Sequence, residues 1–391
     1  MDTVNVGVVG CGNISGIYFQ NIAAYRGLRL AACADLRHEA ARAQAERYGI
    51  DAMPVEDLLA RADIDLVVNL TVPGAHFGVS MAALRAGKHV FSEKPLTVDV
   101  EQGRALVDEA EARGLRLGCA PDTFLGAGGR LARRLVDEGA VGRILSGTAF
   151  LMSHGMEHWH PDPEFFFKPG GGPILDMAPY YLGTLVNLIG PVRRVSAMAG
   201  IGFPERVVTA DSPRRGHRIT VETPTTVMAL LEFASGAQVT FCMSWDVWKH
   251  GHPPIELYGT EGSMRVPDPN FFGGAVELTE RGGDWRTMDA GGLPLGVPNW
   301  RSPAWPAEAP SRANYRALGL ADLASAVLHG TPHRSTGRLA LHVLEVMHAI
   351  LESAAGGQPV AIATAPERPA ALEDAEAAKL WKGLPEAASA A

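Results

Sequence analysis

Glycine residues that follow the first apolar segment of the chain are the first sign of chemistry. Gly10 permits a tight turn, and Gly12 lets the backbone approach a pyrophosphate, whose charge is favoured at the N-terminus of the following helix. Asp35 ends the next apolar segment, where an acidic side chain can bind the ribose hydroxyls of a nucleotide. These features predict a dinucleotide site that includes Gly10, Gly12, Asn13, Ile14 and Asp35.

Asp35 also bears on which dinucleotide is bound. Its carboxylate accepts hydrogen bonds from two ribose hydroxyls but repels a 2′-phosphate, so we expect NAD, with NADP the less favoured cofactor. Arg37 could instead pair with that phosphate or stack on adenine. A solvated arginine at the start of a helix is an equally good interpretation, and both stay open.

A segment dense in imidazoles, residues 153–161, is a candidate for substrate binding. Trp159 could form an apolar platform for a carbohydrate, and His158 or His160 could orient its hydroxyl groups. Ordinary packing explains each histidine almost as well. Trp245 belongs to a similar, weaker cluster. A His-x-His pair can bind metal, but no complete ligand set can be named, so we expect no metal site.

The elements that must position these residues alternate in type over the first third of the chain. Apolar strand-like segments are separated by amphipathic helical ones, which predicts βαβ units and a parallel sheet. Expected strands are 5–9, 28–34, 64–70, 88–91 and 115–119, and expected helices are 39–48, 55–61, 75–86 and 98–113. Asp122 follows the fifth strand, at the end where open α/β sheets place ligands; initiation of a turn after Pro121 is the competing interpretation.

The rhythm changes after about residue 121. Longer strand-like runs with few helices between them predict a largely antiparallel sheet. Those strands are 143–152, 192–199, 225–233, 237–243 and 255–258, and expected helices are 126–138, 314–328 and 337–353. We therefore expect an α/β protein with two domains, 1–121 and 122–391. The length and the Gly- and Pro-rich composition of segment 282–310 predict a lid or a contact arm. The last 25 or so residues are expected either to pack as a strand and short helix against a partner or to form a frayed tail.

Composition excludes several classes of protein. The 391 residues carry a net charge of −8, which argues against a nucleic-acid or anionic-membrane partner. No run of 18 apolar residues and no secretory signal is evident, so we expect no membrane span. The four cysteines form no CxxC pair, which fits buried thiols in a reducing cytoplasm.

Three motifs together resemble the Gfo/Idh/MocA oxidoreductases, the family of glucose–fructose oxidoreductase and inositol dehydrogenase. They are TVPGAH at 71–76, AGKHVFSEKP at 86–95 and GGGPILD at 170–176, and with the glycine loop they span most of the chain. The resemblance implies an N-terminal Rossmann domain and a C-terminal α/β domain with an open sheet. It also implies NAD(P)-dependent oxidation or reduction of sugars or polyols, and a homodimer or homotetramer formed through that sheet.

The resemblance assigns roles to individual residues. Lys94 is identified as the catalytic lysine of the Glu-Lys-Pro motif, and Pro95 keeps it out of the helical region. Burial beside the positive charge of the oxidised cofactor should favour neutral lysine, a usable proton acceptor. Further residues are implied to contact the cofactor: Thr71, Pro73, His76 and Glu93.

The second-domain motif departs from the family. An aspartate and a histidine usually stand one helical turn apart, but here Asp176 is followed by Tyr180. Tyrosine can donate or relay a proton, although its reference pKa of about 10 makes it a poor base near neutrality. Asp176 is expected to contact substrate, with helix capping as the alternative.

Together these features predict an NAD-dependent dehydrogenase that oxidises a secondary hydroxyl of a sugar, glycoside or cyclitol. Lys94, Asp176 and Tyr180 would be its catalytic residues, and substrate contacts would come from Lys94, Asp122, His158, Trp159, His160, Asp176, Tyr180 and Trp245. A carbonyl reductase working in reverse and an NAD-binding regulatory protein without turnover are the alternatives.

Overall fold

The computed structural model describes residues 2–302, 305 and 308–384. The chain folds into two compact units: a first unit of Met1–Gly126, Tyr315–Leu344 and Pro369–Ala391, and a second unit of Ala127–Asn314 and Glu345–Arg368. A single boundary at 121/122 therefore does not describe the chain after Asn314, where Tyr315–Leu344 and Pro369–Ala391 return to the first unit and Glu345–Arg368 belongs to the second. The return is anchored by Trp381, whose ring lies 4.8 Å from that of Tyr25.

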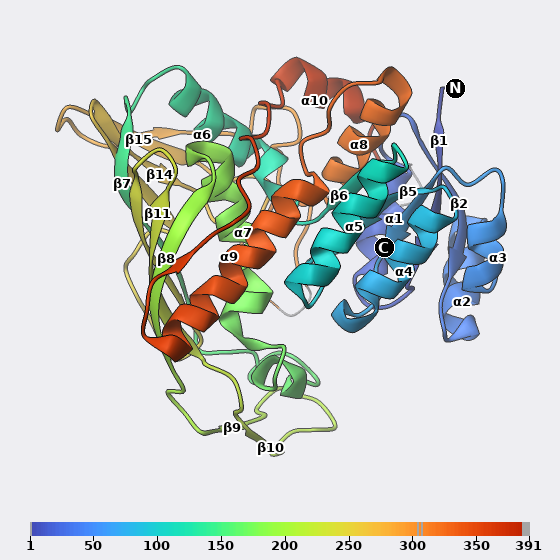
Figure 1. The fold of residues 1–391 in the computed structure, drawn as a ribbon, viewed down its shortest axis with the longest axis horizontal. Coiled ribbons are helices and arrows are strands. Elements are labelled where there is room, and N and C mark those ends of the chain that lie inside the picture. Colours follow the sequence, from blue (N-terminus) through green and yellow to red (C-terminus); the bar gives the residue numbers. More distant parts are fainter. Residues whose placement is uncertain (1, 303–304, 306–307, 385–391) are drawn as a thin grey trace. The chain divides into compact units, whose positions relative to one another are not determined.

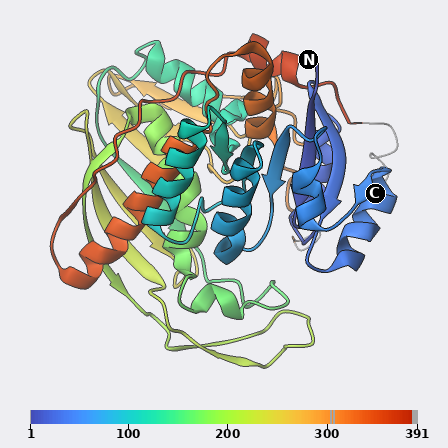
Figure 2. The ribbon, with the colours of Figure 1, turned by 45° about the vertical axis from the view of Figure 1, so that its right-hand side comes forward.

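The first unit is built on a six-stranded sheet in which all neighbouring strands are parallel, in the order β3-β2-β1-β4-β5-β6. This confirms the expected parallel, Rossmann-like sheet. Its strands are β1 (Val4–Val9), β2 (Leu28–Ala34), β3 (Asp51–Ala52), β4 (Leu66–Asn69), β5 (His89–Ser92) and β6 (Leu117–Cys119). The central strands are apolar and buried along their length because helices cover both faces of the sheet (Figure 2).

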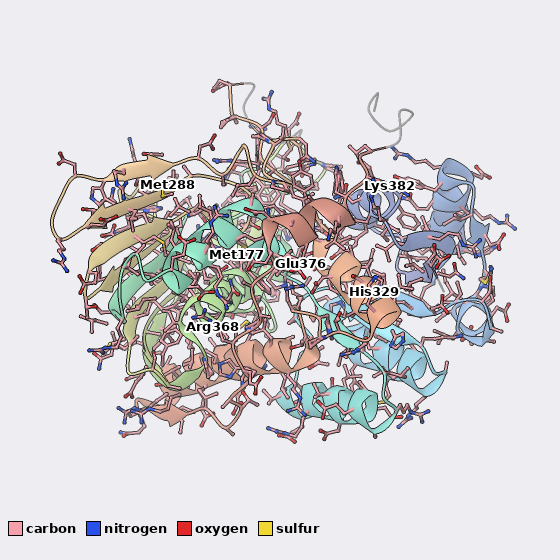
Figure 3. The ribbon with its side chains drawn as sticks, turned by 90° about the horizontal axis from the view of Figure 1, so that it is seen from above. Met177, Met288, His329, Arg368, Glu376 and Lys382 are labelled. Atoms are coloured by element: carbon pink, nitrogen blue, oxygen red, sulfur yellow. The ribbon has the colours of Figure 1, made fainter. Side chains whose placement is uncertain are left out.

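The helices of the first unit are α1 (Ser15–Ile22), α2 (His38–Tyr48), α3 (Val55–Ala60), α4 (His76–Arg85), α5 (Val100–Ala112), α8 (Leu318–His329) and α10 (Asp374–Leu380), with short 3-10 turns η1 (Pro73–Ala75) and η2 (Thr123–Leu125). The bounds of α2, α3, α4 and α5 are close to those expected. The helix expected from residue 314 begins at Leu318, because Ala317 before it adopts a left-handed conformation (φ 78°). The tail contains α10, whose Glu376, labelled in Figure 3, pairs with Arg334 at 2.7 Å.

The second unit is built on a nine-stranded sheet in the order β16-β15-β14-β13-β7-β12-β11-β8-β17. Only β12 and β7 are parallel neighbours, so the expectation of a largely antiparallel sheet is confirmed. Its strands are β7 (Ile144–Met152), β8 (Val192–Gly200), β11 (Thr226–Phe233), β12 (Gln238–Ser244), β13 (Ile255–Gly259), β14 (Gly262–Val266), β15 (Val276–Glu280), β16 (Arg286–Met288) and β17 (Val360–Ala361).

Helices α6 (Ala127–Asp137) and α7 (Gly172–Ile189) contact one face of this sheet (Figure 1). The opposite face exposes large apolar side chains, among them Met198, Met228 and Leu230, which are 80%, 59% and 61% exposed. The sequence pattern does not predict a helix of this length at α7. Its residues are apolar on nearly every side because it is buried, so it lacks the amphipathic pattern of a surface helix.

A separate pair of short strands, β9 (Glu205–Val207) and β10 (Arg218–Thr220), forms an arm of the second unit (Figure 2). The segment 282–310, expected as a lid or contact arm, contains β16 and a bridge between Trp300 and Arg312. Residues 303–304 and 306–307 of this segment lie outside the described residues.

Helix α9 (Gly337–Gly356) is the one described helix that is long and apolar enough to cross a membrane by length and composition. This differs from the expectation that no segment of the chain is suited to span a membrane. The helix carries buried side chains such as Leu344, Val346 and Ile350, and more than half of its apolar stretch is buried inside the structure. A core helix has the same properties, so α9 is weak evidence for a membrane span.

Candidate functional site

The glycine loop lies between β1 and α1 and uses glycine where a side chain would not fit. Gly10 has φ 103°, and a Cβ there would lie 2.6 Å from the backbone carbon of Leu70. A Cβ on Gly12 would instead meet nothing within 4 Å. The loop is therefore packed on the sheet at Gly10 and open at Gly12, as a loop that receives a ligand against its backbone must be.

Backbone donors are available at this open side. Within the described part of the chain, no acceptor is recorded for the N–H groups of Gly12, Asn13 and Ile14, and Ile14 caps α1 without a side-chain bond. Unpaired N–H groups at a helix N-terminus attract anions, both by hydrogen bonding and through the helix dipole. The loop thus fits the pyrophosphate of a dinucleotide.

Asp35 is held at the edge of the loop. Its carboxylate accepts hydrogen bonds from the backbone N–H groups of Cys11 (2.7 Å) and Arg37 (2.8 Å). Each oxygen keeps a second lone pair that could accept from a ribose hydroxyl. The Arg37 guanidinium lies 3.9 Å from the carboxylate and is 76% exposed, so it is placed at the site but not fixed by packing.

We expect NAD to bind more tightly than NADP, because the fixed Asp35 carboxylate would repel a 2′-phosphate. Asp35→Ser should narrow the difference between the two dissociation constants by about 10-fold or more, the effect of roughly 1.4 kcal/mol. Calorimetric titration with each cofactor measures the two dissociation constants. Asp57→Ser, at an exposed aspartate of α3, is the matched control. Tighter binding of NADP by the unmodified protein would mean that Arg37 dominates.

The Glu-Lys-Pro turn follows β5 and is anchored by Glu93. The buried carboxylate of Glu93 accepts from the Tyr18 hydroxyl (2.8 Å), the Arg316 guanidinium (2.9 Å) and the backbone N–H of Lys94 (2.9 Å). Burial raises the pKa of Glu93, but Arg316, Tyr18 and Lys94 outweigh it and hold that pKa below its usual value. Glu93 therefore fixes the backbone of the turn that presents Lys94.

His76 joins this turn to the segment after β4. Its ring is almost fully buried, with Nδ1 2.7 Å from the Pro95 carbonyl oxygen and Nε2 3.0 Å from that of Thr71. The Thr71 hydroxyl donates to Asn69 at 2.6 Å, whereas Pro73 is exposed. His76 thus holds backbone in place, and we expect it to support cofactor binding through Thr71 and Pro95.

Asp122 lies at the carboxyl end of the sheet, as expected, but only 1% of it is exposed. One oxygen accepts from the backbone N–H of Gly319 at 2.8 Å, near the start of α8, and the other is buried without a recorded partner. Burial raises the pKa of Asp122 to about 6, against the opposing attraction of Arg316. Its position favours a structural role at the start of α8 over direct contact with a ligand.

In the second unit, Asp176 and Tyr180 both lie on α7, one helical turn apart, as their i,i+4 spacing predicts. Asp176 is half-buried, whereas Tyr180 is 5% exposed and Tyr181 is 2% exposed. The N-terminal end of α7 is fixed tightly: a Cβ on Gly171 would lie 2.5 Å from the carbonyl oxygen of Phe166. Glycine at position 171 therefore lets the 3-10 turn η3 (Glu164–Phe167) pack against the start of α7.

The imidazole segment separates into exposed and buried parts. His158 and Trp159 are exposed, Trp159 by 46%, and His160 is half-buried. Trp245 is completely buried and packs against Phe166 and Phe167 in a small core. Trp159 can therefore offer its ring to a ligand, whereas Trp245 supports the segment by packing in the core beneath Phe166 and Phe167.

A buried arginine, which sequence analysis did not single out, fixes this segment. The Arg206 guanidinium, from β9, donates to Glu157 at 2.8 Å and to the backbone oxygen of Trp245 at 2.9 Å, and it pairs with Asp246. The backbone oxygen of Glu157 accepts from the N–H groups of Thr209 and Ala210. Arg206 lies far from these partners in sequence, so no spacing pattern could have identified it.

Comparison with known proteins matches both parts of the chain. The family model described as "Oxidoreductase family, NAD-binding Rossmann fold" matches residues 4–120, and the model described as "GFO/IDH/MocA C-terminal domain" matches residues 130–265. Both motifs quoted for the first domain fall within the first range.

Curated relatives act on sugars and cyclitols according to their names. The chain is 28% identical to 1,5-anhydro-D-fructose reductase of Ensifer adhaerens, over 83% of this chain and 88% of the relative. It is 34% identical to dTDP-3,4-didehydro-2,6-dideoxy-alpha-D-glucose 3-reductase of Streptomyces violaceoruber (67% and 72%) and 26% identical to inositol 2-dehydrogenase of Rhizobium meliloti (67% and 75%). A levoglucosan dehydrogenase solved with NADH and L-sorbose shares the fold, with a TM-score of 0.76, 24% identity and coverage of 93% and 99%.

Proposed function

Since the chain belongs to the Gfo/Idh/MocA family of NAD-binding oxidoreductases, we propose that it oxidises a secondary hydroxyl of a sugar, glycoside or cyclitol with NAD. The observation that carries this proposal is the glycine loop, whose open backbone donors lie beside the fixed carboxylate of Asp35. The names of the relatives, which are sugar and cyclitol dehydrogenases and reductases, support the class of substrate.

The cofactor, when bound, accepts the hydride, and the protein supplies binding, orientation and proton management. The loop Gly10–Ile14 and Asp35 hold the dinucleotide. Lys94 takes the proton from the substrate hydroxyl, from a turn whose backbone is fixed by Glu93.

Substrate contacts in the second unit are assigned to Asp176, Tyr180, His158, Trp159 and His160. A carboxylate, a phenol, imidazoles and an exposed indole suit a polyol, which offers hydroxyl groups on an apolar ring framework. Asp122 and Trp245 are given supporting roles, because both side chains are almost fully buried.

Reduction of a keto-sugar is the second candidate function, and it is favoured by the relatives that are named reductases. The same residues serve both directions, because a proton acceptor in oxidation is a proton donor in reduction. A cytoplasmic location, where NAD(H) is available, is part of the proposal and agrees with four cysteines that are all unpaired and buried.

The proposal is tested by following NADH absorbance with a panel of sugars, glycosides and cyclitols, and with the matching keto compounds in reverse. Turnover of at least one alcohol supports the dehydrogenase, and turnover only of ketones supports the reductase. Tight NAD binding with no turnover of any compound in either direction would instead indicate a regulatory NAD-binding protein.

The exposed face of the nine-stranded sheet is assigned to self-association as a homodimer or homotetramer. Met228 lies opposite Met198 on neighbouring strands, and Leu230 is two residues further along β11, so the three side chains form one apolar patch. Apolar patches of this kind are typical of protein–protein interfaces.

We expect Met228→Asp with Leu230→Asp to dissociate the oligomer, because the interface would then bury unpaired charges. Light scattering after size exclusion should give a multiple of 41.5 kDa for the unmodified protein and a single chain for the double variant. Val98→Asp, at a 47% exposed position in the first unit, is the control and should leave the mass unchanged. A monomeric unmodified protein would contradict the assignment.

A further inference from the structure

His160 differs from the other histidines of its segment in how its ring is held. Its Nδ1 accepts a hydrogen bond from the backbone N–H of Asp162 at 3.1 Å. The rings of Trp159, Phe165 and Phe166 meet it edge to face, with centroids 5.4, 5.6 and 5.3 Å away. The ring plane is therefore set by three aromatic neighbours and one hydrogen bond.

This arrangement fixes the tautomer. A nitrogen that accepts a hydrogen bond carries no hydrogen, so neutral His160 carries its hydrogen on Nε2. Nε2 makes no hydrogen bond with any described residue, and it is not buried. Nε2–H is thus an accessible donor, and none of the described residues receives it.

Surroundings of the ring keep it neutral. Burial lowers the pKa of His160 below its usual value, although a backbone hydrogen bond with Asp162 and the negative charges of Asp162 and Asp176 act in the opposite direction. A neutral imidazole of this tautomer can donate from Nε2 but cannot take a proton there.

The donor belongs to the same part of the second unit as Asp176. Phe166, which contacts His160, lies in η3, and the η3 backbone packs against Gly171 at the start of α7. Asp176 is in the second turn of that helix, and the negative charge of its carboxylate acts to raise the pKa of His160.

We propose that His160 donates a hydrogen bond from Nε2–H to a hydroxyl oxygen of the polyol substrate and does not act as a base. The inference rests on the proposed function and deepens it. Asp176 supplies an acceptor and His160 a donor from one part of the second unit, a combination that matches a polyol, whose hydroxyl groups both donate and accept. His158 and Trp159 then contribute contact area, whereas His160 distinguishes a hydroxyl from a hydrogen at one carbon.

The test compares His160→Phe with His160→Gln. Phenylalanine fills the aromatic site but cannot donate, whereas the glutamine amide can donate to substrate and accept from the Asp162 N–H. We expect His160→Phe to raise KM by about 10–100-fold while changing kcat and the NAD dissociation constant by a few-fold at most, and His160→Gln to recover most of the loss. His329→Phe, at the exposed histidine that ends α8 (labelled in Figure 3), is the control.

Deoxy analogues of the substrate separate hydrogen bonding from simple support of the fold. The penalty of His160→Phe should shrink to within about 2-fold for the one analogue that lacks the contacted hydroxyl, because neither partner of the bond is then present. Equal penalties for every analogue, or equal losses with phenylalanine and glutamine, would overturn the inference.

Polyol affinity of the NADH-loaded protein is measured in parallel by calorimetry, which needs no turnover. An unmodified protein that turns over polyols with no effect of His160→Phe would overturn the inference alone. Absence of polyol binding and of turnover in the unmodified protein would overturn the proposed function and the inference together.

Discussion

Lys94→Ala should lower kcat by about 10²–10⁴-fold, the usual contribution of a general base, while NAD affinity changes by a few-fold at most. The structure explains why the two effects should separate. Glu93 accepts a hydrogen bond from the backbone N–H of Lys94, and its other partners are Tyr18 and Arg316. Truncation of the Lys94 side chain leaves all three bonds available, so the turn should keep its shape.

Two further variants sharpen this prediction. Lys94→Arg keeps a positive charge, but a guanidinium does not deprotonate, so it should not restore turnover if Lys94 is the proton acceptor. Lys379→Ala, at an exposed lysine of α10, is the control and should match the unmodified protein. Stopped-flow and steady-state NADH absorbance measure turnover, and calorimetry measures cofactor affinity. An active Lys94→Ala protein would refute the assignment and shift attention to residues 154–160.

The parts of the molecule that sequence could predict are those whose physical cause is local. The glycine loop is one, because Gly10 directly follows β1 and adopts a positive φ that glycine favours. The parallel sheet is another, because strands covered on both faces are apolar along their whole length.

Interactions between distant parts of the chain could not be predicted in this way. Arg316 pairs with Glu93 across 223 positions, and neither residue type nor spacing marks the two as partners. Arg206 fixes the imidazole segment from a strand 49 positions beyond Glu157. The return of α8 and α10 to the first unit depends on contacts such as that of Trp381 with Tyr25, which no local pattern encodes.

Burial also separates residues that look alike in sequence. Trp159 and Trp245 are both tryptophans near histidines, yet Trp159 is 46% exposed and Trp245 is completely buried. Asp35 and Asp122 both follow strands of the parallel sheet, yet Asp122 is 1% exposed and serves the start of α8. Whether a polar or aromatic side chain meets a ligand depends on packing that comes from the whole domain.

Tyr180 is the position at which the chain departs from its family, and its replacement tests what the departure means. Tyr180→Phe should lower kcat/KM by about 10–100-fold, consistent with loss of one charge-assisted hydrogen bond of about 1.5–3 kcal/mol. The pH profile of the residual activity should stay unchanged, because Lys94 would still accept the proton. Tyrosine itself is a poor base near neutrality, since its reference pKa is about 10.

The neighbouring Tyr181→Phe provides a matched control on the same helix. Tyr181 is buried, and burial together with Asp268 raises the pKa of its hydroxyl well above the usual value, so it should stay protonated and inert. Its replacement should change thermal stability more than kcat/KM. If Tyr180→Phe also changes only stability, Tyr180 is a packing residue, because its 5% exposed ring then makes no contact that the reaction uses. If it abolishes turnover while Lys94→Ala is tolerated, the phenol has replaced lysine as the group that moves the proton.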